Sequence, residues 1–204
     1  MKNLVNQKNN KNGYTILETM ISLSIFLVII LSGMSSLLNA NIVYNRSNNL
    51  RSVLDNLSFI MEDISRNLRT GYNVHCFING DPAPSPSNVG TPKSCDNGFA
   101  IAFENDVGDA SSTADQWVYS VEASSGVFNV LKSTDGRATP GVGMTAGGIY
   151  IDSSSGFSVL GAPSAQASPA NSQQPITTIR ISGYVIYKSV NIPFSLQTSV
   201  SQRR

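Results

Sequence analysis

The strongest constraint on this chain is an apolar run near its N-terminus, which reads "KNGYTILETMISLSIFLVIILSGMSSLL" over residues 11–38. Between Glu18 and Arg46 lie 27 residues without a charge. About 20 apolar residues in a helix, which rises ~1.5 Å per residue, are enough to cross the ~30 Å hydrocarbon core of a bilayer. The run therefore predicts one transmembrane helix over about residues 17–38.

The charges around this run predict its orientation. Lys2, Lys8 and Lys11 precede it, and residues 1–13 contain no acid. Because positively charged flanks stay in the cytoplasm, the N-terminus is expected inside and the rest of the chain outside. The whole chain has a net charge of +1, 13% charged residues and one histidine. This composition argues against a nucleic-acid groove, a metalloenzyme and a histidine-dependent hydrolase, and no small-molecule substrate is expected.

Glu18 is unexpected at the head of such a helix, because a carboxylate in a bilayer costs free energy. Three interpretations are open. The run could be a secretory signal cut after "LNA", ending at Ala40, although it exceeds the roughly 7–15 apolar residues of such signals. It could be a plain single-span anchor whose Glu18 reaches back to the cytoplasmic interface. The third interpretation takes "GYTILE", Gly13–Glu18, as one motif.

This motif resembles the class III leader of type IV prepilins and of the pseudopilins of type II secretion. The resemblance implies that residues 1–13 are a cytoplasmic leader, which a prepilin peptidase removes after Gly13. Tyr14, where the family usually has Phe, would become the N-methylated terminus, and Glu18 would be the fifth mature residue. It also implies an assembly role for Glu18, whose carboxylate would meet the new α-amino group of Tyr14 or of a neighbouring subunit.

A helical pattern continues beyond the membrane run. Apolar residues recur at steps of three and four, as on one face of an amphipathic helix: Leu50, Val53, Leu54, Leu57, Ile60, Met61, Ile64 and Leu68. No proline interrupts Thr15 to Thr70, and Gly71 suits the position after a helix C-terminus. The sequence thus predicts one continuous helix over residues 14–70, which resembles a pilin stem and is not typical of a cleaved signal.

Residues 71–204 have a different period. Short segments rich in β-branched and aromatic residues alternate with Gly, Ser, Asn and Pro, which predicts antiparallel strands. They are Phe99–Glu104, Trp117–Glu122, Val127–Lys132, Ile149–Asp152, Phe157–Leu160, Ile176–Ser182, Tyr184–Ser189 and Ile192–Gln197.

Two hairpins are expected among these strands. "WVYSVE" and "VFNVLK" would pair through the four-residue loop "ASSG", and "ITTIRIS" and "YVIYKS" would pair with Gly183 at a turn or bulge. The predicted fold class is α+β, with a long N-terminal helix, transmembrane and then amphipathic, packed on a C-terminal antiparallel β-sheet head.

Cys76 and Cys95 enclose 18 residues of this extracytoplasmic region. An oxidising exterior favours a disulfide between them over a Cys/His nucleophile at His75–Cys76. Two proline-containing segments, residues 81–93 and 161–175, are expected to be mobile surface loops that could contact partners.

The acidic stretch over residues 104–115 suggests a calcium-binding loop, but it lacks the D-x-[DN]-x-[DN]-G spacing of such loops. No catalytic residue, cofactor or metal is therefore expected.

Two further stretches, "LSFIMEDISRNLRTG" and "FSLQTSVSQRR", look similar to J-type minor pseudopilins and related minor pilins. The implied function is a structural minor subunit of a type IV pilus or type II secretion pseudopilus, and not an enzyme. Its implied location is the bacterial inner membrane and then the filament. Its implied partners are prepilin peptidase and other pilins, contacted through the N-terminal helix. The alternative is a membrane-anchored or secreted β-rich binding module with no filament role.

Overall fold

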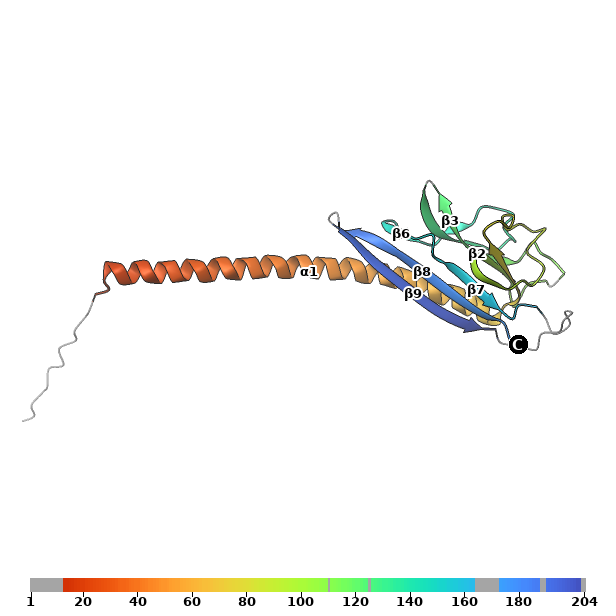
Figure 1. Cartoon of the computed structure of the whole chain (residues 1–204), viewed down its shortest axis with the longest axis horizontal. Helices are drawn as coiled ribbons and strands as arrows, with labels where there is room; N and C mark the ends of the chain where they lie inside the picture. Colours follow the sequence, from red (N-terminus) through yellow and green to blue (C-terminus); the bar gives the residue numbers. More distant parts are fainter. Residues whose placement is uncertain (1–12, 110, 125, 164–172, 188–189, 203–204) are drawn as a thin grey trace, which may run out of the picture. The chain divides into compact units, whose positions relative to one another are not determined.

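The computed structural model describes residues 13–109, 111–124, 126–163, 173–187 and 190–202. The chain divides into two compact units, residues 1–48 and 49–204, called here the N-terminal unit and the C-terminal unit. Helix α1 (Ile16–Thr70) makes up most of the described part of the N-terminal unit and supplies the only helix in the described part of the C-terminal unit (Figure 1).

The C-terminal unit contains an antiparallel sheet, with nine strands in the described ranges. Its order is β1-β2-β3-β4-β6-β8-β7, and β7 also pairs with β2, so the sheet curves back on itself. β5 pairs with β4, and β9 pairs with β8. The strands are β1 Tyr72–Ile78, β2 Cys95–Glu104, β3 Trp117–Ser124, β4 Val127–Ser133, β5 Val142–Gly143, β6 Ile149–Ile151, β7 Gly156–Leu160, β8 Ile176–Tyr187 and β9 Val190–Ser201.

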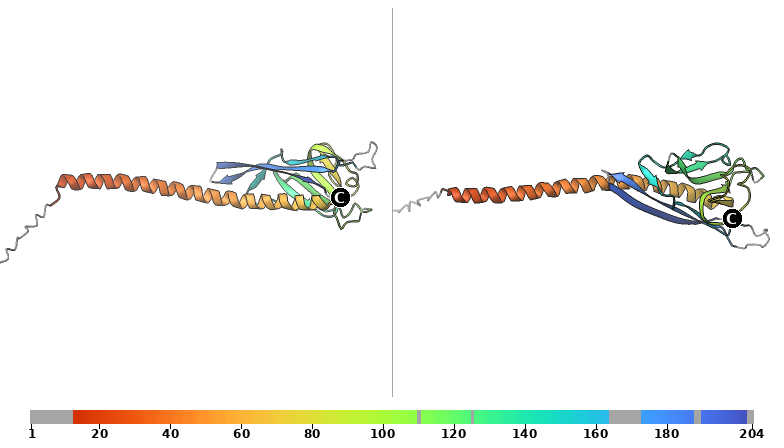
Figure 2. Two further views of the ribbon diagram at one scale, coloured as in Figure 1. Left: turned by 90° about the horizontal axis from the view of Figure 1, so that it is seen from below. Right: turned by 45° about the horizontal axis from the view of Figure 1, so that its top comes forward.

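The second half of α1 packs one apolar face against this sheet, as the views in Figure 2 show. Its fully buried side chains are Leu57, Ile60, Ile64 and Leu68. Burying each of them contributes about 1.5–3 kcal/mol before the entropy of ordering is subtracted. The predicted α+β class is therefore confirmed, and the three- and four-residue spacing identified the face of α1 that packs on the sheet.

Helix α1 ends at Thr70. A glycine at the next position suggests a left-handed backbone that caps the helix, but Gly71 does not have one. The backbone of Gly71 stays outside the left-handed region. A Cβ at Gly71 would overlap the ring of Phe103 and lie 2.9 Å from the carbonyl oxygen of Glu104. Gly71 is therefore suited to a close approach of the chain to β2.

The two predicted hairpins need correction. In the β3–β4 hairpin, Ser124 lies opposite Val127, so the loop has two residues and not the expected four. Gly126 has a φ of 81°, which suits the tight turns of two-residue hairpins. β8 runs straight through Gly183 and pairs with β9 along its whole length, so the expected turn or bulge at this glycine was wrong. A Cβ at Gly183 would overlap the carbonyl oxygen of Tyr150 on β6.

A polar cluster joins α1 to the sheet within the hydrophobic core. It consists of Asp63 and Asn67 on α1, Tyr119 on β3 and Lys132 on β4, and is called here the Asp63 cluster. The Tyr119 hydroxyl donates to Asp63 Oδ2 at 2.7 Å, and Lys132 Nζ lies 2.8 Å from the same oxygen. Asn67 Nδ2 donates to the Tyr119 hydroxyl at 2.9 Å and to Asp63 Oδ1 at 3.2 Å.

The electrostatics of the Asp63 cluster favour the ionised carboxylate. Burial opposes ionisation of Asp63, but hydrogen bonds from Lys132, Tyr119 and Asn67 outweigh it and lower the pKa of the carboxyl. Burial and the neighbouring carboxylate raise the pKa of Tyr119, so its hydroxyl keeps its proton. Lys132 Nζ also lies 4.4 Å from the centroid of the Trp117 ring, where the cation is stabilised by the aromatic face.

The segment over residues 81–93 is not a loose surface loop. Val89 is fully buried in a small second core, formed with Phe77, Ala100, Ala102 and Val118. Lys93 and Asp81 form an ion pair at 2.6 Å that ties the ends of the segment together. Pro84 is buried as well, so the expectation of a loop that lies wholly on the surface was wrong here. Of the other predicted loop, residues 161–175, the part over 164–172 lies outside the described residues.

Candidate functional site

The N-terminal end of α1 is organised by a short polar motif. Thr15 precedes the first helical residue, and its Oγ1 accepts a hydrogen bond from the Glu18 backbone N–H at 3.3 Å. A threonine followed three residues later by a glutamate is the spacing of a helix capping box. Thr15 was not identified from the sequence as a site residue, although the pattern T-x-x-E would have found it.

The structure places the three residues predicted for processing and assembly in open surroundings. Gly13 has no atom within 4 Å of the position that a Cβ would occupy, so nothing in the described chain requires glycine there. Tyr14 is 82% exposed and lies just before the helix, and Glu18 is exposed in its first turn. A carboxylate in this turn is stabilised by the positive end of the helix dipole. Neither the cleavage after Gly13 nor the pairing of Glu18 with an amino group is tested by this geometry.

Between Glu18 and Arg46 the surface of α1 has no charged side chain and is mostly apolar. Its large hydrophobic side chains up to Tyr44 are all exposed, and the most apolar 18-residue window has none of its residues buried. The hydroxyls of Ser24, Ser32 and Ser35 donate to carbonyl oxygens four residues earlier in the helix. Because these polar groups are satisfied internally, they are compatible with an apolar surrounding. By length and composition, α1 can cross a membrane.

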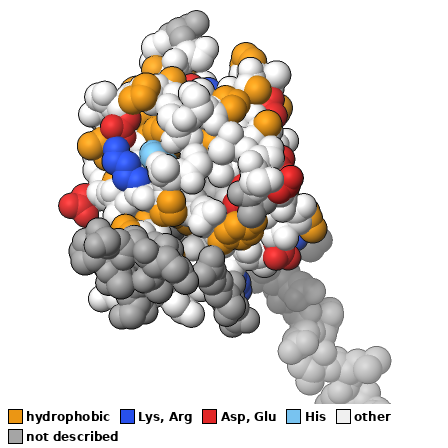
Figure 3. Space-filling model, turned by 90° about the vertical axis from the view of Figure 1, so that its right-hand side faces the viewer, with side chains coloured by type: hydrophobic (Ala, Val, Ile, Leu, Met, Phe, Trp, Pro, Cys, Tyr) orange, Lys and Arg blue, Asp and Glu red, His pale blue; other side chains and the backbone are white. Residues whose placement is uncertain are grey.

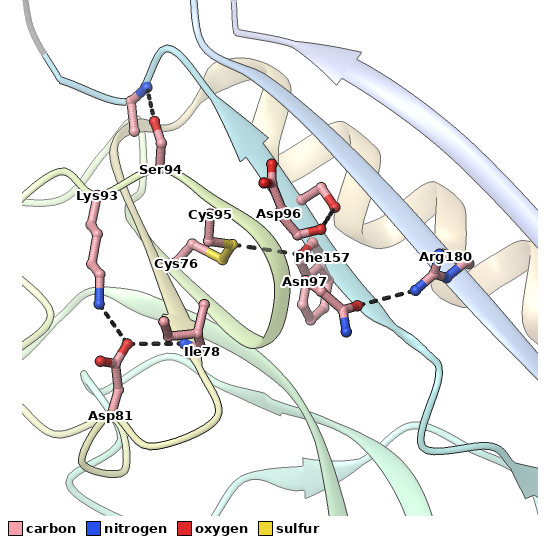
Figure 4. The surroundings of a disulfide bond; sticks show 12 residues. Cys76, Ile78, Asp81, Lys93, Ser94, Cys95, Asp96, Asn97, Phe157 and Arg180 are labelled. Atoms are coloured by element: carbon pink, nitrogen blue, oxygen red, sulfur yellow. Dashed lines mark hydrogen bonds and ion pairs between the residues drawn. A yellow bond between two sulfur atoms is a disulfide. The ribbon is translucent and has the colours of Figure 1, made fainter.

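The predicted disulfide between Cys76 and Cys95 is present, with a Cα–Cα distance of 5.8 Å. It links β1 to the start of β2, next to the ion pair of Lys93 and Asp81 (Figure 4). The Cys95 sulfur also lies 3.6 Å from the carbonyl oxygen of Phe157 on β7. The bridge therefore joins β1 and β2 at a corner of the sheet where β7 is in contact with it.

His75, the neighbour of Cys76, is packed inside the fold. It is 8% exposed, and its Nδ1 contacts the carbonyl oxygen of Thr91. Burial lowers the pKa of His75, although the contact with Thr91 acts in the opposite direction. With Cys76 in the disulfide, no thiol is available beside this imidazole for nucleophilic chemistry.

The acidic stretch over residues 104–115 contains one buried carboxylate among its described residues, that of Glu104 at the end of β2, which is 1% exposed. Burial and the negative charge of Asp115 raise the pKa of Glu104. Across the described ranges, no group of three or more His, Cys, Asp and Glu side chains is arranged to hold a metal ion. On the face drawn in Figure 3, the Lys and Arg side chains of described residues do not merge into an extended basic surface.

Comparison with known proteins gives one match, at the N-terminus. The family model described as the prokaryotic N-terminal methylation motif matches residues 8–34. No curated protein and no solved structure matches the chain. The matched stretch contains Gly13, Tyr14 and Glu18 and extends into the exposed apolar part of α1. The chain therefore carries a prokaryotic N-terminal methylation motif of the class III prepilin type, followed by a helix that can cross a membrane.

Proposed function

We propose that this chain is a structural subunit of a type IV pilus or of a type II secretion pseudopilus. It is inserted in the inner membrane as a single-pass precursor with a cytoplasmic N-terminus, processed by prepilin peptidase and assembled through α1. The observation that carries the proposal is the methylation motif over residues 8–34, joined directly to an unbroken helix with an exposed apolar surface.

Processing requires the peptide bond between Gly13 and Tyr14 to be accessible. Both residues precede the first helical residue, Ile16, and neither is packed against described parts of the chain. Because the fold leaves room for a side chain at Gly13, the stability of the chain does not require a glycine there. We attribute this glycine to recognition by the peptidase. Gly13→Leu is expected to give a membrane-inserted precursor that keeps its leader, whereas the fold of the C-terminal unit stays unchanged.

Glu18 then has a role in assembly. Cleavage gives Tyr14 a free α-amino group with an ordinary pKa of about 8, which is cationic at neutral pH. In a filament packed through apolar helices, a subunit brings this cation into a region of low dielectric constant. A carboxylate at Glu18, on the same or the neighbouring subunit, would neutralise it, and an unpaired charge there would cost about 3–5 kcal/mol.

The decisive experiment compares Glu18→Val with Glu18→Asp in cells that contain the assembly machinery. Leader cleavage is followed by the shift in mass, and assembly is followed by cross-linking to other pilin-like subunits. Glu18→Val should be cleaved normally but lose cross-links, and Glu18→Asp should be intermediate because its reach is shorter. Glu62→Val is the matched control, since Glu62 is an exposed acid of the same helix beyond the apolar run. Equal cross-linking of Glu18→Val and wild type would reject the proposal.

Within this class, we assign the chain to the minor subunits of the J type. The assignment is supported by the resemblance of the α1 segment over residues 57–71 and of the last strand, β9, to that group.

A second candidate is an anchored binding module that acts alone. It is favoured by the complete hydrophobic core of the C-terminal unit. For such a module, Glu18→Val makes the span more apolar, so its function should persist.

A further inference from the structure

Two polar side chains are buried where β2 ends and β3 begins. Glu104 is the last residue of β2, and Gln116 directly precedes β3. Because Phe103 pairs with Trp117 in the antiparallel register of these strands, the next position along the pair brings Glu104 and Gln116 opposite each other, on one face of the sheet. Glu104 is 1% exposed and Gln116 is 3% exposed.

Three side-chain oxygens in this region have no hydrogen-bond partner among the described residues, although all three atoms are buried. They are Oε1 of Glu104, Oδ1 of Asp115 and Oε1 of Gln116. All three are hydrogen-bond acceptors, and two of them belong to carboxyl groups. Buried polar atoms in folded proteins are nearly always paired, so an unpaired set of this kind indicates a bound water or ion.

The electrostatics of Glu104 show that these groups lie together. Burial raises the pKa of Glu104, the negative charges of Asp115 and Asp109 raise it further, and a hydrogen bond with the Gln116 side chain acts in the opposite direction. The Asp109 N–H donates to Asp115 Oδ2 at 2.7 Å, which leaves Oδ1 of the same carboxyl unpaired. None of these acids takes part in the ion pairs found within the described ranges.

The connection between the two strands approaches Glu104 closely at Gly108. A Cβ at Gly108 would lie 2.0 Å from Glu104 Oε1 and 3.2 Å from the carbonyl oxygen of Asn105. The backbone of Gly108 stays outside the left-handed region, so glycine is required here by the close approach and not by its own conformation. The Asn105 carbonyl oxygen therefore lies beside the Glu104 carboxyl, as one more oxygen in the same place.

A proton or a single water molecule cannot satisfy this set of oxygens. A proton on Glu104 provides one O–H donor, which pairs with only one of the other two side-chain oxygens. A water molecule has two donors for three acceptors, and it does not offset the negative charge of the carboxyls. A cation attracts all the oxygens at once and neutralises the buried charge, which is costly without a partner.

We propose that Glu104, Asp115 and Gln116 form a calcium site in the C-terminal unit, called here the Glu104 site. Calcium takes about six to eight oxygen ligands in irregular geometry, from carboxylates, amide and backbone carbonyls and water. Magnesium is less suitable, because it requires a nearly ideal octahedron and loses its water reluctantly. Backbone carbonyls such as that of Asn105, together with water, would complete the coordination.

The Glu104 site is consistent with the absence of a group of three His, Cys, Asp and Glu ligands in the described part of the chain, because its third side chain is an amide. No spacing in the sequence reveals it, since the oxygens come together only through the pairing of β2 with β3. The site depends neither on cleavage after Gly13 nor on Glu18, so its failure would leave the proposed function untouched.

The position of the single tryptophan makes a direct binding test possible. Trp117 follows Gln116 in the chain, so its excitation should sensitise the emission of a terbium ion bound at the Glu104 site. The full chain in detergent is freed of metal with a chelator and titrated with terbium. We expect emission that saturates at one ion per chain. Calcium should displace terbium at about 0.1–1 mM, the range of extracellular calcium modules, and magnesium at the same concentration should not.

Thermal unfolding gives a second readout that does not use terbium. Calcium at about 10 mM should raise the Tm of the wild type by at least about 3 °C relative to chelator, because it binds only the folded state. Glu104→Gln keeps the shape of the side chain and removes its charge. This variant should lose both the terbium emission and the calcium-dependent rise, while its Tm in chelator is not lower than that of the wild type.

Asp152→Asn is the matched control, since Asp152 is an exposed acid in the turn between β6 and β7. It should keep both signals. The proposal is overturned if calcium leaves the Tm of the wild type unchanged, as a protonated Glu104 without a metal predicts. It is equally overturned if Glu104→Gln retains the signals, or if Asp152→Asn loses them to the same extent.

Discussion

The Asp63 cluster gives the sharpest prediction about what holds α1 on the sheet. Tyr119→Phe removes one buried hydroxyl and keeps the ring, which stacks on Phe103 with centroids 6.0 Å apart. It removes the donor to Asp63 at 2.7 Å and the acceptor of Asn67 at 2.9 Å. A hydrogen bond to a charged group is worth about 1.5–3 kcal/mol. We therefore expect a loss of about 2 kcal/mol in the free energy of unfolding.

This loss should appear in the unfolding of the full chain in detergent. For a unit of this size, about 2 kcal/mol corresponds to a decrease in Tm of about 4–8 °C. Trp117 is the chain's single tryptophan and lies beside Lys132, so its fluorescence reports unfolding next to the cluster. Tyr184→Phe is the matched control: Tyr184 stacks on Tyr150 with centroids 5.1 Å apart and contributes no hydroxyl to the Asp63 cluster.

The pH dependence of a companion variant checks the charge assignment. The lowered pKa of Asp63 stabilises the fold above the ordinary carboxyl pKa, and this contribution is lost as the pH falls through the folded value. In Lys132→Met the carboxylate loses its cation, so the variant should be most destabilised near neutral pH and approach wild type at acidic pH. The reasoning is refuted if Tyr119→Phe and Tyr184→Phe unfold within about 0.5 kcal/mol of each other, the range of ordinary surface substitutions.

Three further predictions concern the corner near the disulfide and the end of α1. Burial lowers the pKa of His75, so the unfolded chain binds the proton more readily. The free energy of unfolding should therefore fall as the pH drops below about 6.5, and His75→Asn should flatten this dependence between pH 7.5 and 5.5. Replacing Cys76 and Cys95 together by serine should cost about 3 kcal/mol for a ring of this size. Peptide mapping under non-reducing conditions would contradict the bridge if both native thiols were alkylated. Gly71→Ala should lower stability by about 1–3 kcal/mol through overlap with Phe103, although helix propensity alone favours alanine; an unchanged Tm would argue against this close approach.

The sequence predicted the parts of the fold that follow from periodicity. The steps of three and four from Leu50 to Leu68 identified the face of α1 that packs on the sheet, and Leu57 and Ile64 on it are fully buried. The disulfide could also be predicted from the sequence, because the chain has only two cysteines. These features depend on local pattern and composition, which one sequence contains.

The errors arose where tertiary contacts decide the role of a residue. A glycine between two apolar segments suggests a turn, but Gly183 lies within β8 because β6 passes close to it. β1 was missed although its sequence has the period of a strand, because Tyr72, Val74 and Cys76 alternate with Asn73 and His75. Val89 gave no sign in the sequence that it would be buried beneath its segment. The cap at Thr15, by contrast, could have been predicted from its spacing to Glu18.

The central claim is that the chain is a processed prepilin, and mass spectrometry of its mature N-terminus tests this most directly. The protein is purified from membranes of a host that has a prepilin peptidase, and its N-terminal peptide is sequenced. We expect the peptide to begin at Tyr14 and to carry one additional methyl group on its α-amino nitrogen. A peptide that begins at Asn41, as after a secretory signal, or at an intact Met1 would contradict the account.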